Sequence, residues 1–315
     1  METTQKLLRF LDESPTCYHA AANVCAALKA AGAVELRESE PWRLERGTLY
    51  VVVRGDSALM AFRLPEGKPR GFLLAAAHDD SPTFKLRENA EVRAPGDTLR
   101  LSVEPYGGGI WRGWLDRPLS VAGRVLVRTA AGVEPRLVNV DRDLLMLPSL
   151  AIHMNREVNK GVELNKQIDM IPVAGLLAEE EKNVDYFLSF LAKELSVAKE
   201  DILDFELSVY CKEQPEYVGV ADDFISSPRL DNLTSCAALV SGILDAERKD
   251  GINLIALFDH EEIGSRSKQG AGSILLHDML LRILAECGAK ESAQGLLYQS
   301  MLLSVDVAHG LHPNQ

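Results

Sequence analysis

Three short apolar runs in this chain each end in side chains of the kinds that bind metal ions. Leu73–Ala77 precedes His78-Asp79-Asp80, Asn253–Phe258 precedes Asp259-His260-Glu261-Glu262, and Met301–Val305 precedes Asp306. Runs of this length and composition are typical of buried strands, and ligand sites in open α/β sheets lie outside the carboxyl ends of the strands. The pattern therefore predicts an α/β sheet whose strand ends bring these polar side chains together.

The alternation of helix and strand is interrupted in the middle of the chain. Residues 85–136 contain alternating segments, such as Thr98–Val103 and Arg124–Arg128, broken by Gly and Pro, which is typical of antiparallel β structure. From Asp231 onward the α/β pattern returns. We therefore expect a catalytic α/β domain made of residues 1–89 and 221–315, interrupted by a β-rich insertion at 90–220.

The candidate ligands indicate a particular class of metal chemistry. Carboxylates with one imidazole suit Zn, Mn or Co better than Ca or Mg, and Asp231, at the start of an expected helix, is a further candidate ligand. Adjacent Glu261 and Glu262 point in different directions, so one can bind metal while the other takes a proton from water. Asp80 can hold the imidazole of His78 in the correct tautomer. Paired metals recur in aminopeptidases, and the set favours a di-metal hydrolase.

Each of these residues also has an ordinary structural explanation. A lone histidine is usually structural, a pair of glutamates usually lies on a solvated surface, and Asp306 could cap a helix or occupy a turn. The combination favours a di-metal hydrolase over the structural alternative because each group follows a buried run, where a solvated charge is least expected.

The charge balance excludes two classes of partner. Lys and Arg number 34 against 46 Asp and Glu, which gives a formal net charge of −12. Nucleic acids and anionic membranes need basic patches, so neither is an expected partner. The N-terminal segment does not resemble a signal peptide, no apolar run is long enough to span a bilayer, and the five cysteines are scattered. These features predict a cytoplasmic protein.

Six segments carry more distinctive motifs. They are His78-Asp-Asp-Ser-Pro82, Tyr106–Val125 with its Gly-Gly-Gly-Ile-Trp, Ile152-His-Met-Asn-Arg156, Pro228-Arg-Leu-Asp-Asn232, Phe258-Asp-His-Glu-Glu-Ile-Gly-Ser265 and Ser304–Asn314. Together, and in the same order, they resemble the motifs of the aspartyl aminopeptidases, a family of di-zinc peptidases. One departure is Asp79, which stands where the family's motif has threonine.

The resemblance implies a role for each candidate residue. It implies that His78 and Asp306 bind one metal, Asp231 bridges two, Glu262 binds the second, Glu261 is the general base and Asp80 orients His78. It further implies that His153 reaches the active site of a neighbouring subunit and that His309 lines the substrate pocket. Two Zn²⁺ ions per active site are implied, with Co²⁺ or Mn²⁺ as alternatives.

The same resemblance implies a fold and an activity. The fold is an α/β/α sandwich interrupted by an all-β dimerisation domain, and the subunits build dimers and then hollow dodecamers. The activity is removal of N-terminal Asp or Glu from peptides. Two alternatives stay open: a di-metal amidohydrolase or aminopeptidase of other specificity, and a catalytically inactive shell subunit. The second arises because the family continues beyond the point that matches residue 315, with a portion that supplies a histidine ligand for the second metal, so we expect this chain to lack that portion.

Overall fold

The structure, a computed structural model, describes residues 2–181, 185–246 and 249–314, and the chain forms two compact units. The first unit comprises residues 1–81 and 215–315, and the second comprises 82–214. These divisions differ by a few residues from the expected ones at 89/90 and 220/221. The first difference arises because β5 (Thr83–Ala94) is one continuous strand of the second unit, although its composition changes only part of the way along it.

The first unit contains a six-stranded sheet in the order β1-β2-β3-β13-β4-β14. Its strands are β1 (Val34–Glu35), β2 (Leu49–Arg54), β3 (Ala58–Arg63), β4 (Phe72–His78), β13 (Ile252–Phe258) and β14 (Met301–Ser304). Strands β13 and β14 both run parallel to β4, on either side of it. The three apolar runs singled out in the sequence are therefore neighbours, and their carboxyl ends meet at one edge of the sheet.

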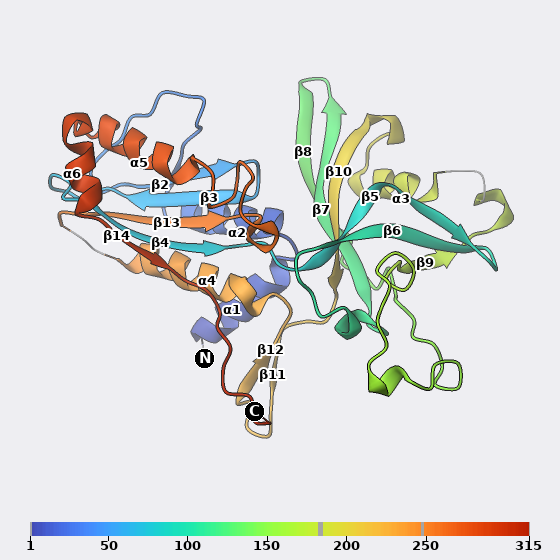
Figure 1. The fold of residues 1–315 in the computed structure, drawn as a ribbon. Helices are drawn as coiled ribbons and strands as arrows, with labels where there is room; N and C mark the ends of the chain where they lie inside the picture. Colours follow the sequence, from blue (N-terminus) through green and yellow to red (C-terminus); the bar gives the residue numbers. More distant parts are fainter. Residues whose placement is uncertain (1, 182–184, 247–248, 315) are drawn as a thin grey trace. The chain divides into compact units, whose positions relative to one another are not determined.

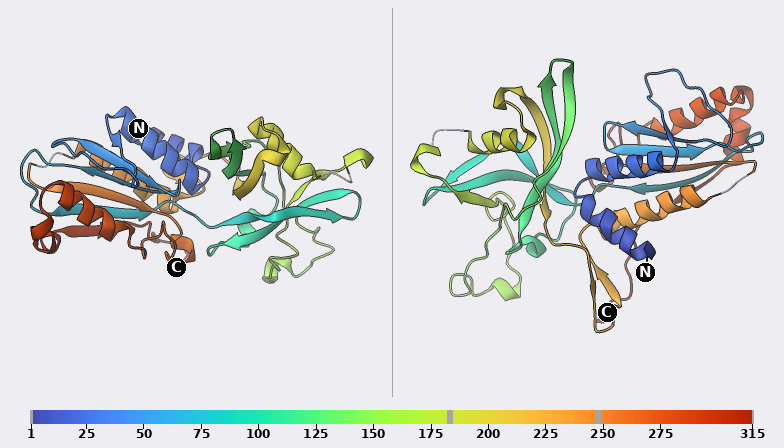
Figure 2. Two further views of the ribbon diagram at one scale, coloured as in Figure 1. Left: turned by 90° about the horizontal axis from the view of Figure 1, so that it is seen from above. Right: turned by 180° about the vertical axis from the view of Figure 1, so that it is seen from behind.

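Helices cover both faces of this sheet, as Figures 1 and 2 show. One face carries α1 (Glu2–Glu13), α2 (Cys17–Ala30) and α4 (Leu230–Asp245), and the other carries α5 (Leu275–Glu286) and α6 (Ala293–Tyr298). Helix α2 begins after Thr16, whose backbone is extended and whose side chain makes no capping hydrogen bond to the helix. The unit is thus an α/β/α sandwich, as expected.

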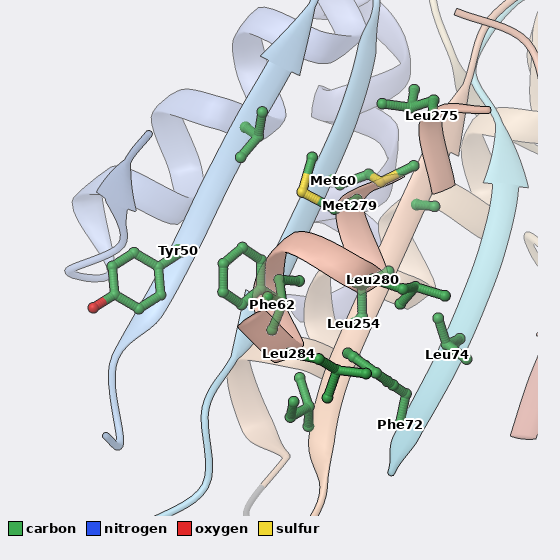
Figure 3. Packing of buried hydrophobic residues seen from close by; sticks show 14 of the residues in the cluster. Tyr50, Met60, Phe62, Phe72, Leu74, Leu254, Leu275, Met279, Leu280 and Leu284 are labelled. Atoms are coloured by element: carbon green, nitrogen blue, oxygen red, sulfur yellow. The ribbon is translucent and has the colours of Figure 1, made fainter. Parts of the chain in front are cut away.

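The central strand β13 contributes to the core on both faces. All seven of its residues are buried. Leu254 and its alternate neighbours pack with α5, and Figure 3 shows Leu254 beside Leu280 and Leu284. Ile255 and Leu257 instead pack with α1, α2 and α4. This alternation follows from the two-residue period of a strand, and the covering of both faces explains why the strand is apolar throughout.

The second unit is built on an antiparallel sheet in the order β8-β7-β10-β5-β6-β9. The strands besides β5 are β6 (Thr98–Tyr106), β7 (Leu119–Thr129), β8 (Gly132–Asn139), β9 (Val173–Leu176) and β10 (Ile202–Cys211). Helix α3 (Tyr186–Leu195) packs on the sheet through Phe187 and Leu191, in a core separate from those of the first unit.

A small hairpin leads from the end of the insertion back into the first unit. It consists of β11 (Glu216–Val218) and β12 (Phe224–Ser226), and α4 follows it. Short 3₁₀ helices complete the fold: Trp111–Trp114, Val158–Lys160, Glu179–Glu181, Lys199–Asp201, Glu261–Ile263 and Lys290–Ser292. None of the helices in the described ranges combines the length and apolar character needed to cross a membrane.

Candidate metal centre

Three side chains from separate segments converge at the carboxyl edge of the first sheet. His78 is the last residue of β4, Asp306 lies just beyond β14, and Asp231 is in the first turn of α4. The Nε2 atom of His78 is 3.3 Å from Oδ1 of Asp231 and 3.7 Å from Oδ1 of Asp306. One ligand atom from each residue lies within 4.8 Å of the others.

This donor set fits zinc. A zinc ion lies about 2 Å from imidazole nitrogen and carboxylate oxygen, so ligand atoms around one ion are separated by roughly 3–4 Å. The distances from His78 to both carboxylates fall in or near that range, and the imidazole-plus-carboxylate combination matches the chemistry of catalytic rather than structural zinc sites. His78, Asp231 and Asp306 could therefore hold one cation between them.

Local structure places Asp231 toward the two other ligands. Asp231 and Asn232 depart from helical backbone angles at the start of α4, and the peptide bond between them is cis. The Ser81 hydroxyl donates a 3.0 Å hydrogen bond to the carbonyl oxygen of Asp231. Burial and the nearby charge of Asp306 raise the pKa of Asp231. The cluster thus carries negative charge that a bound cation would offset.

Asp80 contacts both parts of the site. Its Oδ1 lies 3.2 Å from Nδ1 of His78. Its two oxygens also accept hydrogen bonds from the backbone N–H groups of Glu261 and Glu262, each at 3.2 Å. Asp80 therefore contacts both His78 and the turn after β13, and the sequence did not indicate the second contact. Its role in orienting His78 stays a prediction.

The electrostatics of His78 follow from this contact. Burial lowers the pKa of His78, but the hydrogen bond to Asp80 and the charges of Asp80, Glu261 and Asp306 together outweigh burial and raise the pKa to about 9. A cation bound at Nε2 would replace the proton held there. Cys236 of α4 also contacts His78: its Sγ donates a hydrogen bond to the backbone oxygen of His78 at 3.1 Å.

The two glutamates follow β13 in the 3₁₀ turn Glu261–Ile263. The Glu261 carboxylate reaches within 3.9 Å of the His78 Nε2 atom, and about half of its side chain is exposed. Glu262 is half-buried, and burial together with the charge of Asp80 raises its pKa to about 7. The three-residue ligand group does not include Glu262. Its assignment to a second metal stays a prediction.

Two buried acids beside the site were not assigned a role from the sequence. Asp79 and Asp259 have exposed fractions of 2% and 1%, respectively. Burial, reinforced by the charges of Asp259 and Asp80, raises the pKa of Asp79 well above its usual value. The only sequence signal was the departure at Asp79 from the family's motif.

The remaining two candidates are exposed. His153 belongs to the second unit, in a turn closed by a hydrogen bond from the Met154 N–H to the Ala151 oxygen. His309 lies in the irregular segment after β14. The structure does not include either residue in the three-residue ligand group, and their roles toward substrate stay predictions.

Comparisons with known proteins identify the family of this chain. Residues 10–315 match the family described as aminopeptidase I zinc metalloprotease (M18). A probable M18 family aminopeptidase 2 of Clostridium novyi is 39% identical over 98% of this chain and 73% of its own length.

Solved structures show the same fold. The Ape4 chain in a cryo-EM structure of the Ape4 and Nbr1 complex is 35% identical, with a TM-score of 0.93 over 99% of this chain. This chain spans 64% of the Ape4 chain. The dodecameric mApe1 of Saccharomyces cerevisiae, 24% identical, matches 98% of this chain and 72% of its own with a TM-score of 0.83, which shows a shared fold. With one family model matching almost its whole length and a zinc-type ligand set at the expected strand ends, the chain belongs to the M18 family of zinc metalloaminopeptidases.

Proposed function

We propose that this protein removes N-terminal Asp or Glu from peptides by metal-assisted hydrolysis. The observation that supports it best is the convergence of His78, Asp231 and Asp306 beside the carboxylate of Glu261. Membership of the M18 family supports the aminopeptidase activity, and the resemblance to aspartyl aminopeptidase motifs supports the acidic preference.

Each residue has a defined task in this proposal. His78, Asp231 and Asp306 would hold one zinc ion, and Glu262, with Asp231, would hold a second. Bound zinc would supply Lewis acidity that lowers the pKa of water and polarises the scissile carbonyl. Glu261 takes the proton from the attacking water and delivers it to the leaving amine, a role consistent with its partly exposed carboxylate. Asp80 holds both His78 and the Glu261–Glu262 turn in place.

We extend the proposal to assembly and location. Self-association through the β-rich insertion, as dimers that build a dodecamer, would allow His153 to reach a neighbouring active site, while His309 would contact substrate within its own subunit. The resemblance supports this arrangement. A cytoplasmic location is supported by five cysteines that form no disulfide.

Replacing Glu261 tests the assignment of the base. Glu261→Gln keeps the side-chain shape but removes the proton acceptor, so we expect turnover to fall by at least about 100-fold. Zinc content, measured by elemental analysis, should stay close to that of the wild type because Glu261 is not a proposed ligand. A variant that retains full activity would reject Glu261 as the base.

The substrate preference is tested with aspartyl-, glutamyl-, leucyl- and lysyl-p-nitroanilide, with and without added Zn²⁺, Co²⁺ or Mn²⁺. Metal-dependent release from the acidic substrates alone is expected. Release from the leucyl substrate instead would keep the metal chemistry and reject the acidic specificity.

A second candidate function, an inactive shell subunit, is favoured by one observation: among the residues that the structure describes, the converging ligand group has three members, enough for one ion. One zinc ion or fewer per chain, together with no release from any p-nitroanilide, would favour this candidate over the enzyme.

A further inference from the structure

Asn232 ties together two of the segments that carry ligands. It follows Asp231 directly, and its side chain is completely buried. Its Nδ2 donates a 3.0 Å hydrogen bond to the backbone oxygen of Val305, the residue before Asp306. One amide group therefore joins the start of α4 to the end of β14.

The three ligand-bearing segments are tied pairwise. The end of β14 is held to β4 by the Val305 N–H, which donates to the Ala76 oxygen at 2.8 Å. The Ser81 hydroxyl holds the segment after His78 to Asp231. The hydrogen bond from Asn232 to Val305 ties the remaining pair, the segments that carry Asp231 and Asp306.

The side-chain oxygen of Asn232 argues against a purely stabilising role for this residue. Oδ1 of Asn232 is buried and has no hydrogen-bond partner among the described residues. A buried polar atom without a partner destabilises a fold, typically by about 1–3 kcal/mol. The amide thus gains one hydrogen bond and leaves one acceptor unpaired, a combination that global stability alone does not explain.

We propose that Asn232 is a positioning residue that sets the separation between the carboxylates of Asp231 and Asp306 and thereby the affinity of the site for zinc. This inference rests on the proposed metal site, although not on the reaction carried out there. Residues that orient metal ligands without touching the metal typically change metal affinity by 10–100-fold when replaced.

The test compares Asn232→Leu with a matched control, Asn253→Leu. Asn253 lies in β13, is 6% exposed, and also has a buried Oδ1 without a partner, but it is at the opposite end of the strand from the Glu261–Glu262 turn. Zinc dissociation constants are measured on the full chain by competition with a chromophoric chelator, and thermal midpoints are measured without metal. We expect Asn232→Leu to bind zinc roughly 10–100-fold more weakly. Its metal-free midpoint should fall modestly, because the Val305 oxygen loses its donor. Asn253→Leu should bind zinc as the wild type does.

Several outcomes overturn the proposal. Zinc affinity within twofold of wild type in Asn232→Leu would do so, as would equal losses in both variants. If Asn232→Leu does not fold, Asn232→Ala takes its place, and failure of both to fold would show that the amide stabilises the fold itself. A wild type that binds zinc but cleaves no peptide would reject the proposed reaction and leave this inference standing, whereas a wild type without zinc affinity rejects both.

Discussion

At the scale of single residues, the charge of Asp80 favours the protonated form of two neighbours. It stabilises the positive imidazolium of His78 and the neutral carboxyl of Glu262. Both effects raise a pKa, to about 9 for His78 and to about 7 for Glu262, where burial is the larger cause. Without a cation, the site therefore holds more protons at neutral pH than its residue types suggest.

Zinc binding should consequently depend on pH. The two proposed cations, one bound by His78 and one by Glu262, would displace the protons of these groups, so affinity should rise between pH 6 and 9. We expect about two protons released per chain at pH 6, from both groups, and about one at pH 8, from His78 alone. Calorimetry in buffers of different ionisation enthalpy measures this number. Asp80→Asn should reduce the release at pH 8, and zinc affinity independent of pH would contradict the assignment.

The same two groups affect the stability of the metal-free protein. Both have folded pKa values above their ordinary values of 6.5 for His78 and 4.5 for Glu262. The contribution of Glu262 to the free energy of unfolding is therefore lost as pH rises from about 4.5 through 7. The contribution of His78 is lost as pH rises from about 6.5 through 9. The unfolding midpoint of the metal-free protein should fall over the range in which zinc affinity rises.

At the scale of elements, β13 connects the hydrophobic core to the site. Leu254, near its start, is 1% exposed and packs beneath α5, whereas the turn after Phe258 carries both glutamates. Truncation of Leu254 should thus affect folding without removing any group that touches the metal.

Leu254→Ala should lower the free energy of unfolding by about 2–5 kcal/mol, because it leaves a cavity in a close-packed core. Leu302→Ala is the matched control: Leu302 lies in β14 of the same sheet but is 54% exposed, so its truncation should change stability by less than about 1 kcal/mol. Urea denaturation followed by circular dichroism measures both. Equal effects in the two variants would contradict the burial of β13.

The strands could be predicted from the sequence, but several contacts between the segments that follow them could not. Apolar runs marked β4, β13 and β14, and the rule that ligands gather at strand ends placed His78 beside Asp306. The contact from Asp80 to the N–H of Glu261 spans 181 residues and involves the backbone, so no side-chain pattern encodes it. The hydrogen bond from Asn232 to the backbone oxygen of Val305 could not be predicted for the same reason. The buried pair Asp79 and Asp259 was missed because acids beside a metal site are expected to bind metal or face solvent.

At the scale of the whole molecule, all the groups proposed to bind zinc or move protons belong to one unit assembled from two stretches of chain. The chain leaves that unit at Ser81–Pro82 and returns to it at Gln214–Pro215. Proline at both crossings suits a boundary, because it limits the backbone and donates no hydrogen bond to a sheet. The change of composition located the insertion only approximately, since strand β5 begins before that change is visible.

The position of β13 between β3 and β4 affects the order in which the two units can fold during translation. Strands β3 and β4 are consecutive in the chain, but the strand that lies between them begins only at Ile252. At roughly 5–20 residues per second, translation from His78 to Ile252 takes about 10–35 s. During that interval every strand of the insertion is synthesised, ending at Cys211, while the surrounding sheet still has a gap at its centre. Vectorial synthesis therefore lets the inserted unit fold first and brings the metal ligands together last.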